Sequence, residues 1–386
     1  MFRSKIMKIL IVSSYFGTVI GGALNFIKEL SIELSSRGHE VNLVLDDRYK
    51  KLFSEKEFKI IWFSSTKITS YSPSFSFLKV MSNIDTDVIL LHGYMSFQTD
   101  FGSLIGYLRK IPVVLTPHGS LRGYDYLNES FRSKIPYHIH DALILKSPTR
   151  IAKYVIGTSQ AEYNDCKRFG VQGKKIGLIP LPFTLPSNVK IERSENKKSK
   201  LLFVGRIVPL KNIDILLKAV KIVKEEIPEI EFSIVGEEIT GRLEGDIGYK
   251  QQMISLVKSL GLENNVVFKG WKTGEELYKI YQESDLFVLA STYENFGLPL
   301  LEAASFGLPL ISTDVGVARE LIGNDEGGNI ISKTNPEEIA KKIIDILRCE
   351  KRYEKASIIT QNNSKQFSIK NITDKYEKIL MELKQN

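Results

Sequence analysis

Two cations follow a hydrophobic run in the second half of the chain. Leu201–Val204 is predicted to be a strand, and Gly205, Arg206 and Lys211 come after it. Asn212 favours the start of a helix, so both cations are expected in a turn between a strand and a helix. Cations beside the unpaired N–H groups of a helix start suit a diphosphate. The alternative is a solvated loop with incidental charges.

A second turn carries two carboxylates. Glu294 follows the predicted strand Leu286–Ala290, and Glu302 comes eight residues later in the predicted helix Leu298–Phe306. Eight residues are about two helical turns, so both carboxylates are expected on roughly the same side of the helix. Glu302 has apolar neighbours, and a carboxylate there is costly unless ligand hydroxyls or a cation satisfy it. Gly297 lets the backbone approach a phosphate closely. A structural pairing with a local Lys or Arg is the alternative.

The elements that must position these residues alternate along the whole chain. Short β-rich runs and helical periods follow each other from Lys8–Val12 to Tyr154–Thr158, and again from Leu201–Val204 to Pro336–Arg348. Glu231–Val235 is one of the predicted strands and Pro336–Arg348 one of the predicted helices. This alternation predicts an α/β protein with doubly wound parallel sheets. In such sheets ligands bind outside the carboxyl ends of the strands, which is where both turns are expected.

The length of 386 residues favours two domains. We expect an N-terminal domain at 1–186 and a second domain at 201–365. Residues 187–200 are rich in Ser, Asn, Lys and Glu and are predicted to form a linker. A helix within 366–386 follows a polar break at 361–366, and it can pack on either domain.

The two turns together resemble those of the retaining glycosyltransferases of family 4, also called glycosyl transferases group 1. The resemblance covers nearly the whole chain. It implies the GT-B fold, in which two Rossmann-like domains face each other across a cleft. The C-terminal domain would hold most of the donor, and the N-terminal domain would serve the acceptor. The residues that carry the resemblance are Gly205-Arg206, Lys211-Asn212, Glu294, Phe296-Gly297, Glu302, Gly21-Gly22, Pro117-His118-Gly119 and Val266–Gly270.

The resemblance also implies a role for each residue at a motif position. Arg206 and Lys211 would bind the diphosphate of a nucleotide sugar and stabilise the leaving group. Glu302 would hydrogen-bond the ribose hydroxyls, Glu294 would hold hydroxyls of the donor sugar, and His118 would contact the transferred sugar. The remaining donor-binding positions are Gly22 and Gly205 near the diphosphate, Phe296, Gly297 and Leu298 near sugar and phosphate, and Lys269, Gly270 and Trp271 near the base.

These roles fit a reaction that breaks an anomeric C–O bond. Negative charge builds on the leaving diphosphate, and fixed cations lower that barrier. Retaining hydrolases instead use a carboxylate nucleophile about 5 Å from the acid. No second carboxylate is an obvious nucleophile here, which favours a front-face mechanism assisted by the leaving phosphate. We therefore expect no metal and no cofactor. Asp85-Thr86-Asp87 imitates a metal motif, but it precedes the run Val88–Leu91 and is interpreted as a strand-entry turn.

Composition narrows the function classes further. The chain is 43% hydrophobic and 25% charged, which excludes a disordered or fibrous protein. Its two cysteines, Cys166 and Cys349, are too few for a disulfide framework and favour a cytoplasmic location. The charge is unevenly divided, because residues 1–186 carry a net +9 and residues 187–386 a net −1. The basic half is expected to face an anionic partner.

Within the basic half, residues 122–150 mix cations with aromatic side chains. Such a mixture suits an anionic membrane surface, so we expect peripheral attachment and a glycan or lipid-linked glycan as acceptor, and no nucleic acid as partner. A soluble acceptor and an idle basic surface are the alternative. The segment contains the cations Arg122, Arg132, Lys134, Lys146 and Arg150 and the aromatic residues Tyr124, Tyr126, Phe131 and Tyr137.

The leading hypothesis is a retaining, metal-independent hexosyltransferase that uses a nucleotide-diphosphate sugar. Two alternatives stay open. One is a nucleotide-sugar 2-epimerase of the same fold, which needs acid and base carboxylates in its cleft. The other is a catalytically silent subunit that only binds a nucleotide sugar. The motifs bind the parts that all nucleotide-sugar donors share, so they do not identify the base, the sugar, the acceptor or the linkage.

Overall fold

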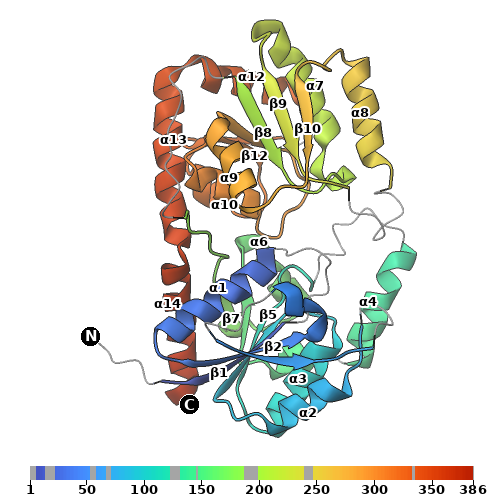
Figure 1. The fold of residues 1–386 in the computed structure, drawn as a ribbon, viewed down its shortest axis with the longest axis vertical. Coiled ribbons are helices and arrows are strands. Elements are labelled where there is room, and N and C mark those ends of the chain that lie inside the picture. The colour runs from blue at the N-terminus through green and yellow to red at the C-terminus, as the bar shows by residue number, and fades with distance from the viewer. Residues whose placement is uncertain are drawn as a thin grey trace. The chain divides into compact units, whose positions relative to one another are not determined.

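The chain divides into two compact units in its computed structural model (Figure 1). Unit 1 consists of Met1–Pro182 and Ile369–Asn386, and unit 2 is Phe183–Ser368. The structure describes residues 6–13, 22–52, 58–66, 71–121, 131–144, 147–186, 199–238, 247–332 and 335–385.

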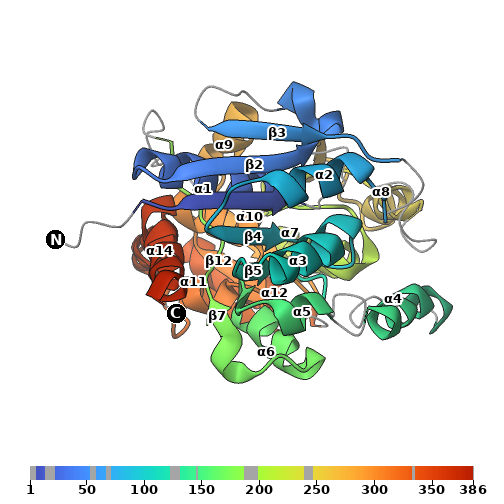
Figure 2. The ribbon, with the colours of Figure 1, turned by 90° about the horizontal axis from the view of Figure 1, so that it is seen from below.

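Unit 1 is built on a seven-stranded parallel sheet with the strand order β3-β2-β1-β4-β5-β6-β7, part of which Figure 2 shows from the side. The order reverses between β1 and β4, which are neighbours with Ser13 opposite His92. Strands β1 and β4 are almost wholly buried, as expected for parallel strands covered on both faces. The strands are β1 (Lys8–Ser13), β2 (Glu40–Asp46), β3 (Lys59–Phe63), β4 (Val88–His92), β5 (Val113–Thr116), β6 (Tyr154–Gly157) and β7 (Ile176–Leu178).

The helices of unit 1 include the last helix of the chain. Helix α14 lies beside α1 in both views (Figures 1 and 2), and Arg37, directly after α1, forms ion pairs with Asp374 and, at 2.8 Å, with Glu377. Tyr376 of α14 is buried, and its hydroxyl lies 3.2 Å from the Thr116 hydroxyl at the end of β5. The helices are α1 (Gly22–Ser36), α2 (Phe75–Asn83), α3 (Phe97–Leu108), α4 (Phe131–Leu143), α5 (Ser147–Ile151), α6 (Gln160–Phe169) and α14 (Ile369–Gln385).

Unit 2 is built on a six-stranded parallel sheet with the order β10-β9-β8-β11-β12-β13. This is the arrangement of a dinucleotide-binding sheet, and its order reverses between β8 and β11. The strands are β8 (Lys200–Val204), β9 (Glu231–Val235), β10 (Val266–Gly270), β11 (Leu286–Leu289), β12 (Leu310–Thr313) and β13 (Gly328–Ile331). The helices are α7 (Ile213–Glu226), α8 (Tyr249–Ser259), α9 (Gly274–Glu283), α10 (Leu298–Ser305), α11 (Ala318–Ile322), α12 (Pro336–Arg348) and α13 (Glu350–Ser364).

The unit boundaries differ from the sequence-based ones by between 3 and 18 residues. Unit 2 begins at Phe183 rather than at 201, and most of the expected linker, 187–198, lies outside the described residues. The polar break expected at 361–366 is wrong in its first part, because α13 continues to Ser364. Thr360 and Ser364 are buried and return their hydroxyls to carbonyls of the same helix, so polar composition did not end it.

No helix among the described residues is long and apolar enough to cross a membrane.

Candidate active site

The two sequence motifs of unit 2 lie side by side at the carboxyl ends of β8 and β11. These two strands are neighbours, with Leu201 opposite Leu286, and they flank the point where the strand order reverses. In open α/β sheets the loops diverge at that point and leave a crevice for a ligand. The turn with Arg206 and Lys211 leaves β8, and the turn with Glu294 leaves β11.

Four bonds tie the β8 turn to the β11 turn, and one of them runs from Asn212 Nδ2 to the Thr292 hydroxyl at 3.0 Å. The Thr292 N–H donates to the Leu210 carbonyl at 2.9 Å, and Lys211 Nζ pairs with Glu294 Oε1. Asn212 Nδ2 donates to the Ala290 carbonyl at 2.7 Å. Asn212 precedes α7 as its N-cap residue, as predicted, but its side chain makes no hydrogen bond to the helix. This residue has a left-handed backbone, and its amide side chain bonds to the β11 segment instead.

The Lys211–Glu294 ion pair is the charged centre of this arrangement. The two side chains are only 9% and 15% exposed, and Ser291 Oγ donates a further hydrogen bond to Glu294 at 2.8 Å. The pairing of a glutamate with a local cation, one of the sequence-based alternatives, thus exists for Glu294. The ion pair leaves hydrogen-bond donors of Lys211 for a ligand, because an ammonium group has three N–H donors.

Arg206 differs from Lys211 in its surroundings. It is half-buried, and its guanidinium makes no hydrogen bond or ion pair with another residue of the described part of the chain. Lys211 is balanced by Glu294, so Arg206 leaves the turn with uncompensated positive charge. A bound anion would compensate that charge.

Glu302 lies in α10, apart from the ion pair. The helix begins at Leu298, and Glu294 lies in the irregular segment before it, so the expected two-turn relation between the two glutamates is wrong. Glu302 Oε2 accepts a hydrogen bond of 2.8 Å from the hydroxyl of Tyr281. Burial raises the pKa of Glu302 to about 7, although the Tyr281 hydrogen bond acts in the opposite direction.

Two glycines allow backbone segments to meet at this edge. A Cβ on Gly236, after β9, would lie 1.9 Å from the carbonyl oxygen of Gly205. A Cβ on Gly316, after β12, would lie 2.1 Å from that of Phe296. Both have positive φ, so no other residue fits there without strain. The Phe296 carbonyl accepts from Val317 N, while the N–H groups of Gly297 and Leu298 make no hydrogen bond to another described residue.

The residues expected beside the base lie at the edge of the sheet. Lys269 and Gly270 end the outer strand β10, whose pairing with β9 shifts register there, and Trp271 follows with 45% of its surface exposed. The Gly236 N–H donates to the Gly270 carbonyl at 2.9 Å, which joins this edge to the glycine at the end of β9. Lys269 approaches Glu231 only at 4.0 Å.

In unit 1 the expected site residues also lie at the carboxyl ends of strands. Gly22 begins α1, and its neighbour Gly21 lies outside the described residues. His118 follows β5 with a left-handed φ of 53°. Its Nε2 lies 3.0 Å from Nδ1 of His92, and the rings stack at 5.3 Å with Phe26 edge-on to both. Burial lowers the pKa of His118 to about 3, so this pair is neutral.

Sequence reasoning missed the partners that hold His118. His92 ends β4 at the point where the strand order reverses, and a histidine directly after the run Val88–Leu91 was a usable signal. Glu162 is buried in α6 and accepts from the Gly119 N–H and, at 2.7 Å, from Thr158 N. Nothing in the local sequence of α6 distinguishes Glu162 from a surface glutamate.

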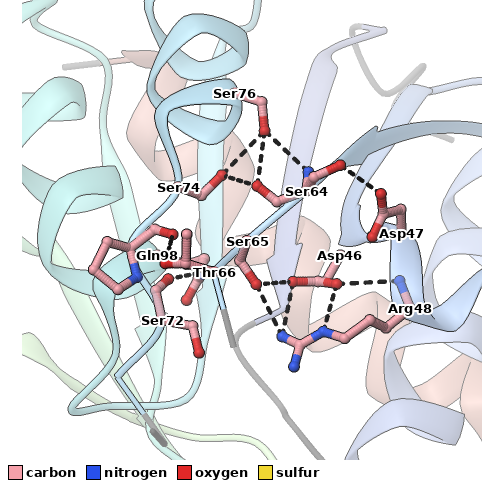
Figure 3. Close-up of polar contacts among 11 residues, drawn as sticks. Asp46, Asp47, Arg48, Ser64, Ser65, Thr66, Ser72, Ser74, Ser76 and Gln98 are labelled. Atoms are coloured by element: carbon pink, nitrogen blue, oxygen red, sulfur yellow. Dashed lines mark hydrogen bonds and ion pairs between the residues drawn. The ribbon is translucent and has the colours of Figure 1, made fainter. Parts of the chain in front are cut away.

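A polar network joins the ends of β2 and β3 (Figure 3). Arg48 binds the Asp46 carboxylate through Nε at 2.7 Å and Nη2 at 2.8 Å, and Ser65 Oγ donates to the same carboxylate. Burial alone would raise the pKa of Asp46, but these bonds hold it below its ordinary value. Ser74 Oγ donates to the Ser64 carbonyl. These polar groups mainly bond to one another. The network therefore ties the residues after β3 to the end of β2 and to the start of α2.

Asp85 and Asp87 act as expected for a strand-entry turn. Asp85 pairs with the side chain of Lys8, and Asp87 accepts from the Lys8 backbone N–H at 2.9 Å. Among the described residues no cluster of three or more His, Cys, Asp or Glu side chains is arranged to hold a metal ion.

Two family models together match almost the whole chain. Residues 20–185 match Glycosyltransferase Family 4, and residues 186–366 match Glycosyl transferases group 1. The chain belongs to this glycosyltransferase family. Its resemblance to the family is thereby confirmed over both halves.

Relatives of this glycosyltransferase cover most of its length. A 41.2 kDa protein from the cps region of Klebsiella pneumoniae is 25% identical over 344 residues, which are 86% of this chain and 87% of that protein. The structure of HepE from Anabaena with UDP and glucose has a TM-score of 0.76 at 21% identity, covering 97% of this chain and all of that one. WaaG, a glycosyltransferase involved in lipopolysaccharide biosynthesis, has a TM-score of 0.70 at 15% identity, covering 96% and 99%. The predicted fold, GT-B with two Rossmann-like parallel-sheet domains, is confirmed.

Proposed function

We propose that this glycosyltransferase moves a hexose from a nucleotide-diphosphate sugar to a glycan acceptor with retention of the anomeric configuration. The observation that carries the proposal is that two cations and a carboxylate follow neighbouring strands where the strand order of unit 2 reverses, with one of the cations paired to the carboxylate. Arg206 and Lys211 leave β8 there, and Glu294 leaves β11. A diphosphate needs the cations, and a sugar needs a hydroxyl acceptor such as Glu294 beside it.

The reaction makes different demands on the two cations. The bond between the anomeric carbon and the diphosphate oxygen breaks, and a bond to the acceptor oxygen forms on the same face. The acceptor proton passes to the leaving phosphate. The uncompensated positive charge of Arg206 stabilises the departing oxygens. Lys211 contacts both the diphosphate and Glu294, which in turn contacts the sugar. Since these cations neutralise the leaving group, the reaction needs no metal.

The roles of the remaining residues are part of the same proposal. Glu302 binds the ribose hydroxyls, and Gly205, Phe296, Gly297 and Leu298 offer backbone to phosphate and sugar. Lys269, Gly270 and Trp271 lie by the base. In unit 1, Gly22 approaches the diphosphate and His118 contacts the sugar. The neutral state of the His92–His118 pair supports that last role, because an uncharged imidazole suits a sugar hydroxyl better than it suits a phosphate.

Incubation with labelled donors tests the function. UDP-glucose is the first probe, since HepE binds it, followed by GDP- and ADP-hexoses. We expect slow hydrolysis without an acceptor, release of an α-configured hexose, and undiminished turnover in EDTA. Formation of the 2-epimer would support the epimerase instead. Binding without turnover of any donor would support a silent subunit, and strict dependence on Mg²⁺ or Mn²⁺ would overturn the metal-free mechanism.

We further propose that the acceptor lies on an anionic membrane at the cytoplasmic face and that α4 docks there. Ile135, Ile139 and Leu143 of α4 recur every four residues and are 39%, 53% and 78% exposed, so they form one outward apolar stripe. Exposed apolar stripes flanked by cations are typical of helices that lie at a bilayer surface. Arg150 in α5 is exposed nearby in sequence. Arg122, Tyr124, Tyr126 and Lys146 lie outside the described residues, as do the side chains of Phe131, Arg132, Lys134 and Tyr137.

The other side of α4 is held to unit 1 by a charged histidine. His140 Nε2 lies 2.9 Å from Asp100 of α3 and its Nδ1 lies 3.4 Å from Asp141, which also accepts from the Tyr94 hydroxyl at 2.7 Å. Burial would lower the pKa of His140, but the two carboxylates outweigh it and raise the pKa to about 9. A helix held in this way can present its apolar stripe outward without collapsing onto unit 1.

Vesicle flotation tests this docking. The protein is expected to float with vesicles containing phosphatidylglycerol at low salt and to be released at high salt, since each basic residue contributes about 1 kcal/mol near an anionic surface. The Ile139→Glu/Leu143→Glu variant should bind at least about tenfold more weakly, because the transfer of two apolar side chains is lost. Ile358→Glu in unit 2 changes an equally exposed isoleucine and serves as the control. Equal flotation of all three proteins would exclude α4, and no flotation of the wild type would exclude the membrane.

A further inference from the structure

Tyr281 contacts the glutamate that the proposed function assigns to ribose. It lies near the end of α9, and its side chain is completely buried. The ring stacks on Phe306 with centroids 5.2 Å apart and planes 15° apart, and Phe287 lies 6.4 Å away. Its hydroxyl donates to Glu302 Oε2 at 2.8 Å. The packed ring therefore aims the hydroxyl at one oxygen of a carboxylate that belongs to a different helix.

The other oxygen of Glu302 is in a different situation. Oε1 makes no hydrogen bond to another residue of the described chain, and the residue is half-buried. A carboxylate that is fixed through one oxygen keeps the second one, with its lone pairs, for an incoming donor. The two hydroxyls of a ribose are such donors. Without a fixed partner, the side chain of a glutamate loses rotamer freedom on binding, and that loss weakens affinity.

We propose that Tyr281 is a positioning residue, which holds Glu302 by one carboxylate oxygen so that the other meets the ribose hydroxyls of the donor nucleotide. This inference rests on the ribose role of Glu302 within the proposed function. It adds a residue that lies between the two turns in the sequence and that no motif includes. The hydrogen bond also favours the ionised carboxylate, which is the form that accepts from both ribose hydroxyls.

The test compares Tyr281→Phe with the wild type by calorimetric titration of UDP between pH 5.5 and 8.5. The ring is kept, so packing against Phe306 stays. We expect about tenfold weaker binding at pH 7, the loss typical of a hydrogen bond to a charged group. The ratio of wild-type to variant affinity should be largest at low pH, because loss of the hydroxyl moves the pKa of Glu302 upward. It should decrease toward the highest pH but stay above 1, because Glu302 is ionised there in both proteins and only the wild type holds it in place. Ionisation of the UDP phosphate cancels in this ratio.

Two controls separate positioning from stability. Tyr249→Phe removes another buried hydroxyl of unit 2, which faces Asp214 at 3.5 Å, and should leave UDP affinity and its pH profile unchanged. In a Glu302→Gln background, Tyr281→Phe should add less than about twofold, because there is no charged oxygen left to position. Full additivity of the two substitutions, or complete recovery of the variant's affinity at the highest pH, would overturn the positioning role.

The same titrations separate this inference from the proposed function. If Glu302→Gln leaves UDP affinity unchanged, and the same holds for ADP and GDP, the ribose role of Glu302 fails. If Glu302→Gln weakens binding and Tyr281→Phe does not, only the positioning role fails.

Discussion

Arg206→Ala and Lys211→Ala are each expected to lower turnover by about 10²- to 10³-fold, the usual cost of removing one preorganised group that stabilises developing negative charge. Steady-state kinetics measures the loss, with whichever donor is turned over in the labelled-donor experiment. Lys218→Ala is the matched control, because it removes a lysine of α7 that is half-exposed and paired with Asp214. Turnover within threefold of the wild type in either active-site variant would remove that cation from the mechanism.

The two substitutions should differ in their effect on stability. Arg206 has no ion pair with a described residue, so the free energy of unfolding of Arg206→Ala should change by less than about 0.5 kcal/mol. Lys211→Ala leaves the Glu294 carboxylate, which is only 15% exposed, without its cation. A loss of about 3 kcal/mol is expected for breaking such a pair from one side. Urea denaturation distinguishes the two cases, and equal stabilities would mean that the ion pair contributes little.

Glu294→Gln and Glu302→Gln are expected to affect different steps. Glu294 faces Lys211 and, in the proposed function, the sugar. Glu294→Gln should therefore lower kcat by about 100-fold and leave the affinity for the bare nucleotide diphosphate within about twofold. Glu302→Gln should instead weaken nucleotide and nucleotide sugar alike, by about tenfold, because the carboxylate addresses the ribose that both contain.

Calorimetry with the nucleotide and kinetics with the donor measure these two steps separately. Glu338→Gln, at the start of α12, is a control glutamate away from both turns. Equal losses of affinity in both active-site variants would contradict the division between sugar and ribose. A stronger loss of nucleotide affinity in Glu294→Gln than in Glu302→Gln would reverse the assignment.

The local elements of unit 2 could be predicted from the sequence. The predicted strand Glu231–Val235 and helix Pro336–Arg348 have the observed bounds. Both have strong local signals, a run of β-favouring residues in one case and an Asn-Pro start with a 3.6-residue apolar period in the other. The continuation of α13 to Ser364 could not be predicted. Thr360 and Ser364 are buried within unit 2, and this packing keeps the helix going although the polar sequence favours a break.

The amino-acid sequence alone is enough to place particular side chains at the ends of particular strands. Arg206, Lys211 and Glu294 each follow a strand by a few residues, and that distance is local information. Strand order is not local, because it depends on how all six strands of unit 2 pack. Only the tertiary structure makes β8 and β11 neighbours, and thereby joins Lys211 to Glu294, 83 residues later.

The supporting contacts were decided in the same way. Tyr281 and Glu302 lie on different helices, His92 and His118 follow different strands, and Glu162 reaches Gly119 from 43 residues away. Each is a side-chain hydrogen bond whose partner is set by packing rather than by spacing. A sequence therefore reveals the residues that touch a ligand through their place in a motif. The residues that hold them in position carry no such mark, because any stretch of chain that folds back to the right place can supply them.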